Sequence, residues 1–194
     1  SPDGRTVAVF GDEHKGKAAL LRIYRVGRGK PKLLHRWRDR AEGTCYSAAF
    51  APDGRTLALG TERRLLLWDA RKGRRIAARD TNAIKALFPR QLQSPRLRMP
   101  GPHLIAFRRD GKQLVTLHGF GVVGVARWKV DGLKPVGWIK RHRAGGTMRA
   151  IAWDRRGTVW LASSTYSPRV WLHAPRGDRF ATVKVLGPEA KAAP

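Results

Sequence analysis

Residues 47–60 read SAAFAPDGRTLALG, which is a short apolar segment, a turn that ends on Gly54, and a second apolar segment. Glycine suits the end of that turn because tight hairpin turns need a positive φ, which other residues adopt only at a steric cost. Apolar runs of this length bounded by Pro, Asp and Gly are typical of β-strands. The stretch therefore predicts a β-hairpin.

The same phrase occurs four times along the chain. Residues 104–117 (LIAFRRDGKQLVTL) and 150–163 (AIAWDRRGTVWLAS) repeat it, and residues 1–10 (SPDGRTVAVF) start at the turn itself. We therefore expect the chain to begin inside a repeat of a longer protein. The shared positions are the turn glycines Gly4, Gly54, Gly111 and Gly157, and the aromatic residues four positions earlier, Phe50, Phe107 and Trp153.

Two more apolar segments follow each hairpin. The first of them closes on an aromatic residue, at Tyr24, Trp68, Trp128 and Trp171, and the second is more polar, as expected for a strand at a solvent edge. Four strands per repeat, with turn glycines 46 to 57 residues apart, are typical of propeller blades. The fold class predicted is all-β, a β-propeller segment of about four blades of four antiparallel strands, whose first blade lacks its opening strand.

The predicted blades cover residues 1–41, 42–81, 102–143 and 144–186, so that residues 1–186 form the propeller segment. Residues 82–101 form an insertion whose prolines rule out a central strand through most of its length. Within it, Asn82 is placed to cap a short helix, and the rival interpretation makes residues 84–89 (IKALFP) a first strand. Residues 187–194 are expected to be a linker or disordered tail.

The second repeat resembles the WD-repeat family, because FAPDGRTLALG is followed by LLLWDARKGR with a literal Trp68-Asp69 pair. The other repeats depart from the family pattern at this pair, and the family's Gly-His pair before the first strand is missing; Glu42-Gly43 stands near that place. The resemblance implies a non-catalytic scaffold that binds a protein or peptide partner through its loops, next to further blades of the same chain.

The charge is unusual: 40 Lys and Arg against 14 Asp and Glu give +26 and a pI near 11.7. Such a surface attracts polyanions, so nucleic-acid or polyanion binding is the alternative function. A background bias towards arginine is favoured over it, because the basic residues are spread over every blade. The candidate contacts for a partner or polyanion are Lys85, Arg90, Arg96, Arg98, Lys140, Arg141 and Arg143.

Nothing in the sequence predicts catalysis, a cofactor or a metal. The six histidines are scattered, and the carboxylates of Asp3, Asp53, Asp110 and Asp154 flank hairpin glycines, where Asp acts as a turn former. The single cysteine, Cys45, excludes an internal disulfide and is compatible with a reducing compartment, so we favour a cytoplasmic location. No apolar run approaches the ~20 residues that span a bilayer, so we expect no membrane span.

Overall fold

The structure is a computed structural model that describes residues 1–13, 18–83, 101–118, 124–141, 147–164, 170–176 and 179–186. Within these residues the regular structure is β-strand, apart from short 3₁₀ turns at 81–83 and at Asp131–Leu133 (η3). The all-β class is therefore confirmed. The predicted helix or strand within 82–101 and the predicted tail 187–194 lie outside the described residues, except for the first two residues and the last residue of 82–101.

Within the described ranges, fifteen strands form four groups that are consecutive in the chain and antiparallel within each group. The first group has three strands: β1 (Thr6–Asp12), β2 (Ala19–Arg25) and β3 (Lys32–Asp39). The second group has four strands: β4 (Cys45–Phe50), β5 (Thr56–Thr61), β6 (Arg64–Asp69) and β7 (Arg74–Asp80).

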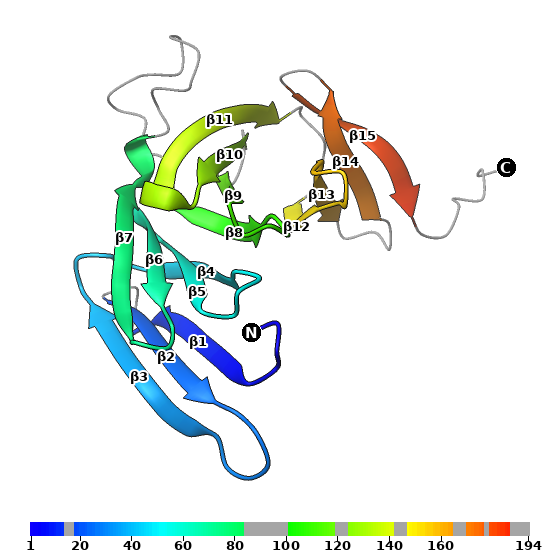
Figure 1. The fold of residues 1–194 in the computed structure, drawn as a ribbon. Coiled ribbons are helices and arrows are strands. Elements are labelled where there is room, and N and C mark those ends of the chain that lie inside the picture. Colours follow the sequence, from blue (N-terminus) through cyan, green and yellow to red (C-terminus); the bar gives the residue numbers. More distant parts are fainter. Residues whose placement is uncertain are drawn as a thin grey trace, which may run out of the picture.

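The third group has the order β8 (Pro102–Phe107), β9 (Gln113–His118), β10 (Gly124–Lys129) and β11 (Lys134–Arg141). The fourth has β12 (Thr147–Trp153), β13 (Val159–Ser164), β14 (Val170–Arg176) and β15 (Arg179–Leu186). A short parallel pairing of β11 with β15 joins these two groups into one eight-stranded sheet, which differs from the separate sheets expected. Figure 1 shows the groups following one another along a curve in chain order.

The four turns that the sequence repeats share one geometry. Gly4, Gly54, Gly111 and Gly157 have φ values of 67°, 63°, 68° and 79°. Each glycine N–H donates to the carbonyl three residues earlier, at 3.0, 3.0, 2.9 and 3.1 Å. The four turns therefore share a tight backbone conformation that only glycine fits without strain, and the last three of them connect the first two strands of their groups.

A carboxylate holds the backbone of each turn. Oδ1 of Asp3, Asp53 and Asp110 accepts the backbone N–H two residues ahead, at 3.1, 2.8 and 2.9 Å. In the fourth turn the carboxylate comes from Asp154, directly after the repeat aromatic, and it accepts the N–H groups of Arg156 and Thr158 at 2.8 Å each. The turn-forming role predicted for these four residues is what the structure shows.

The core lies between successive groups. Along β5, Leu57 and Leu59 face the first group, where they pack with Leu21 and Ile23, whereas Ala58 faces the third group. This alternation follows from the two-residue period of a strand, and burial on both faces explains why β5 reads as a continuous apolar run. A third cluster packs Val115, Leu117 and Val125 of the third group against Val159 and Leu161 of the fourth.

Buried polar groups add a different kind of contact to this core. In the third group, Trp128 Nε1 donates to Thr116 Oγ1 at 2.8 Å, and Thr116 Oγ1 lies 2.7 Å from His118 Nε2. In the second group, the fully buried Glu42 accepts Thr61 Oγ1 at 2.9 Å and pairs with Arg64 Nη1 at 3.1 Å. Glu42 therefore supplies a polar anchor at the place where the sequence lacks a Gly-His pair.

One face of the first group is open. Val7 and Val9 are 43% and 50% exposed, whereas Leu57 and Leu59, at the same distances from their turn glycine, are fully buried. The corresponding Leu114 and Thr116 are also fully buried. The difference arises because, within the described residues, no other group covers this face of β1.

Replacing Gly54 by Val should lower the free energy of unfolding by about 1–3 kcal/mol, because a β-branched residue resists the positive φ of the turn. The matched control is Gly27→Val: Gly27 is exposed, its φ lies outside the left-handed region, and an added Cβ meets no atom within 4 Å. Urea denaturation measures both. Equal stabilities for the two variants would show that the turn does not need this backbone geometry.

The open face of β1 should make this chain self-associate, because exposed apolar side chains at a sheet edge favour pairing. Light scattering should detect oligomers, and the double change of Val7 and Val9 to Thr should reduce their mass. Ile76→Thr is the control, since Ile76 is 56% exposed but lies on the outer strand β7. A monomeric parent, or an equal effect of the control, would contradict this expectation.

Candidate binding cleft between the first two groups

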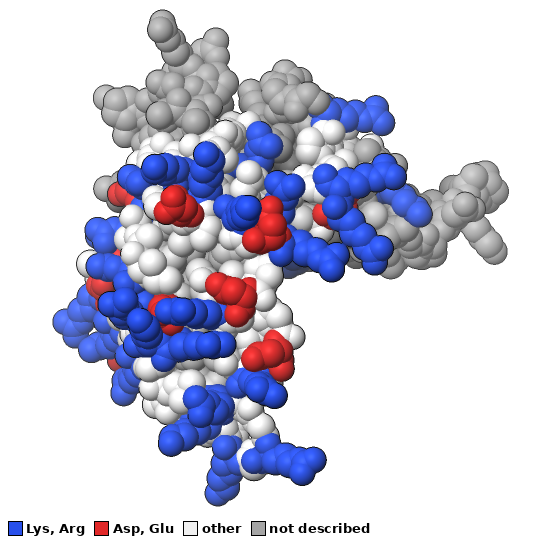
Figure 2. Space-filling model, in the orientation of Figure 1, with Lys and Arg blue, Asp and Glu red and all other residues white. Residues whose placement is uncertain are grey.

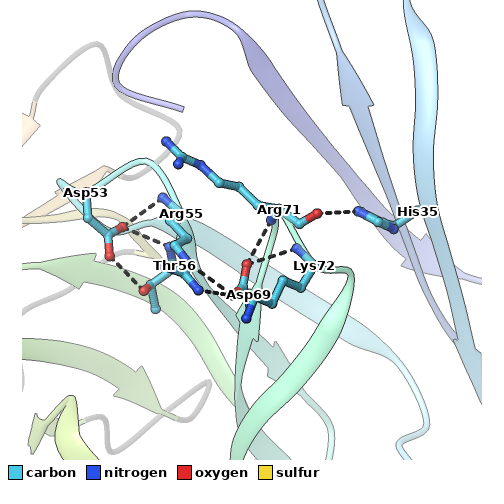
Figure 3. Close-up of polar contacts among 7 residues, drawn as sticks. All are labelled: His35, Asp53, Arg55, Thr56, Asp69, Arg71 and Lys72. Atoms are coloured by element: carbon cyan, nitrogen blue, oxygen red, sulfur yellow. Dashed lines mark hydrogen bonds and ion pairs between the residues drawn. The ribbon is translucent and has the colours of Figure 1, made fainter.

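In the second group, hydrogen bonds to Asp53 hold the turn that connects β4 and β5. Asp53 Oδ1 accepts the backbone N–H groups of Arg55 and Thr56 at 2.8 Å each, and its Oδ2 accepts Thr56 Oγ1 at 2.8 Å. Figure 3 shows these contacts beside a second aspartate, Asp69, at the end of β6. Three hydrogen bonds to one carboxylate fix the direction in which Arg55 leaves the turn.

Arg55 in turn bonds Asp69, the aspartate of the Trp-Asp pair. Its Nε and Nη2 donate to Asp69 Oδ2 at 3.0 and 2.7 Å, while Oδ1 accepts the backbone N–H groups of Arg71 and Lys72 at 3.0 Å each. The Asp69 side chain is only 4% exposed. The Arg55 guanidinium and these N–H groups hold the pKa of Asp69 down at about 2, against the opposing effect of burial.

His35 links this turn to the first group. Its Nε2 lies on β3, 2.9 Å from the carbonyl oxygen of Arg71. Because a carbonyl only accepts, Nε2 carries the proton and donates it. Gly73 has φ 63°, and a Cβ at that position would collide with the His35 ring, so a glycine is required where the two groups meet.

Beside this contact lies an open cleft of about 740 Å³, which we call the turn-end cleft. Its walls come from both groups, and its volume falls within the range of small-ligand sites. Apolar side chains line part of it: Val26, Leu34 and Ala70. The remaining lining residues are Asp3, Arg5, Thr6, Arg25, Gly27, His35, Gly54 and Arg71.

The cleft is electropositive. Arg5, Arg25 and Arg71 are exposed, and none of them makes an ion pair with another described residue. The one carboxylate in the lining, Asp3, accepts Ser1 Oγ and the N–H of Arg5, which lower its pKa. The described lining therefore holds three arginines and one carboxylate, which the turn already uses as a hydrogen-bond acceptor.

The structure does not test the candidate contacts predicted from the sequence. Lys140 and Arg141 belong to β11, but their side chains are outside the described residues. The other five, Lys85, Arg90, Arg96, Arg98 and Arg143, lie wholly outside the described residues, so all seven stay predictions. Sequence reasoning missed the cleft arginines. A usable signal existed, because Arg5 follows a turn glycine and Arg71 follows the Trp-Asp-Ala segment, which places both at the same end of the strands.

Other chemistry is limited within the described residues. They hold no group of three or more His, Cys, Asp or Glu arranged to bind a metal, and burial raises the pKa of the Cys45 thiol to about 12. In the same part of the chain we find no helix with the length and apolar character needed to cross a membrane.

No protein-family model matches the chain, and no curated protein matches it.

The Asp69 carboxylate should contribute about 1–2 kcal/mol to stability at neutral pH, reduced by solvent screening because the Arg55 side chain is half exposed. Its folded pKa, about 2, is below the unfolded value of about 3.9. The contribution is therefore complete above about pH 4 and disappears as the pH falls through 2.

Asp69→Asn tests this contribution. Urea denaturation at several pH values should show the largest stability difference between parent and variant near pH 7 and almost none near pH 2. The control is Asp131→Asn at an exposed site in η3. A difference that does not change with pH would assign the effect to the shape of the side chain rather than to its charge.

Proposed function

We propose that this chain is a WD-repeat-like β-propeller segment that acts as a binding scaffold, and that its turn-end cleft receives an extended segment of a protein partner. The observation that carries this proposal is the cleft itself. It is peptide-sized, it is open, and hydrogen-bonded turns form its walls.

The propeller arrangement is supported by the way neighbouring turns meet. A Cβ built on Gly54 would lie 3.8 Å from Pro2 Cδ, and one built on Gly111 would lie 3.9 Å from Pro52 Cδ. The turns of the second and third groups thus lie against the equivalent turn of the preceding group, as blades around a common axis would place them. The apolar clusters between successive groups support the same arrangement.

A binding role rather than a catalytic one is supported by the use of the described carboxylates. Asp53, Asp69 and Asp154 each accept two or more backbone N–H groups of a turn, so the turns occupy them. A rigid wall of this kind lowers the entropy cost of binding, because it needs no ordering when the partner arrives.

The charge distribution on the face shown in Figure 2 favours a polypeptide partner over a nucleic acid. Figure 2 shows Lys and Arg side chains spread over the groups, with Asp and Glu scattered between them. A nucleic-acid site more often gathers its basic residues on one face or along one helix. The net charge of +26 keeps polyanion binding as the second candidate function.

Selection of a random phage-displayed peptide library on the immobilised protein tests the proposal. The cleft is blocked by Gly27→Trp, since Gly27 lines it and an added side chain there meets no atom within 4 Å of the Cβ. Selected peptides should bind this variant roughly tenfold more weakly or worse, equivalent to about 1.4 kcal/mol.

The control is Gly11→Trp, because Gly11 lies on β1 outside the cleft lining and also has open space around its Cβ. Peptides that bind both variants as well as the parent would show that the cleft is not the site. A library that yields no peptide under these conditions would overturn the proposed function.

A further inference from the structure

The turn-end cleft combines two chemistries that belong to one kind of ligand. Arg5, Arg25 and Arg71 supply guanidinium groups without an ion-pair partner among the described residues, and Leu34 and Val26 supply half-buried apolar surface beside them. A guanidinium binds a carboxylate through two parallel hydrogen bonds, which makes it more specific than a lysine ammonium.

We propose that the ligand of this cleft is an acidic, extended peptide, with carboxylates on the three arginines and an apolar side chain against Leu34 and Val26. This inference rests on the proposed function and names the chemistry of the partner. His35 then has a positioning role, because its bond to the Arg71 carbonyl ties the wall of the first group to that of the second.

The lining distinguishes this ligand from a nucleic acid. Single-stranded nucleic acids bind through bases stacked on aromatic side chains, and the described residues of the cleft lining include no Phe, Tyr or Trp. The apolar residues Val26, Leu34 and Ala70 offer nothing to a sugar or phosphate, but they match an aliphatic side chain. A site of about 740 Å³ accommodates a few peptide residues rather than a long polyanion track.

Arg71 and Lys72 form a matched pair for a test. Both backbone N–H groups donate to Asp69 Oδ1 at 3.0 Å, and both side chains are exposed. Only Arg71 lines the cleft, and Figure 3 shows its side chain running away from that of Lys72. Removing either charge lowers the net charge of the protein equally. A difference in peptide binding between the two variants therefore measures the contribution of the cleft.

The experiment measures fluorescence anisotropy of labelled peptides on the full chain at physiological salt. The probes are a peptide of alternating Glu and Leu, the same peptide with Gln for Glu, and a single-stranded oligothymidylate of equal charge. The Glu-Leu peptide should bind best. Arg71→Gln should weaken its binding about fivefold or more, whereas Lys72→Gln should change it less than about twofold.

Circular dichroism melting confirms that both variants fold, and Arg5→Gln provides a second test at the opposite wall of the cleft. Equal loss in the Arg71 and Lys72 variants, equal binding of the Glu and Gln peptides, or tighter binding of the oligothymidylate would each overturn the inference. If library peptides bind in a Gly27→Trp-sensitive way but lack acidic residues, the proposed function stands and this inference fails.

Discussion

The hydrogen bonds from turn backbone to a carboxylate are the constraint on which the rest of this structure depends. Asp53 and its counterparts accept the N–H groups that a tight turn leaves unpaired, and the glycine of each turn takes the positive φ. Once the turn is fixed, the register of the hairpin is fixed, because Phe50 must face Leu57 across the strands. A shift of one residue would turn every apolar side chain of β5 to the opposite face.

That register decides how the groups pack on one another. Leu57 and Leu59 lie on the face of β5 that packs on the first group, its backward face, and Ala58 lies on the face that packs on the third group, its forward face. Packing a forward face on a backward face repeats from the first group to the fourth. The open valines of β1 are the consequence of the same rule at a face that no described group covers.

The sequence predicted the strands well because their signals are local. Turn glycines with an apolar run on either side predicted the antiparallel pairs β4–β5, β8–β9 and β12–β13. It did not predict the pairing of β11 with β15, nor the burial of Glu42 against Thr61, because both depend on how distant segments meet in space. The turn-end cleft was missed for the same reason: its walls belong to β2 and β3 of one group and to turns of the next, and only packing brings Arg25 and Arg71 together.

The turn chemistry also explains why the arginines of the turn-end cleft have no ion-pair partner among the described residues. The chain has 14 carboxylates for 40 basic residues, and several of those carboxylates, such as Asp3, Asp53 and Asp69, are taken up by backbone N–H groups at the turns. Few carboxylates therefore remain to form ion pairs with the arginines at the same end of the strands. Arg55 forms an ion pair with Asp69, whereas Arg5 and Arg71 form none with a described residue. The carboxylates that stabilise the turns are therefore not available to Arg5 and Arg71, which supports the proposal that the cleft binds an acidic ligand.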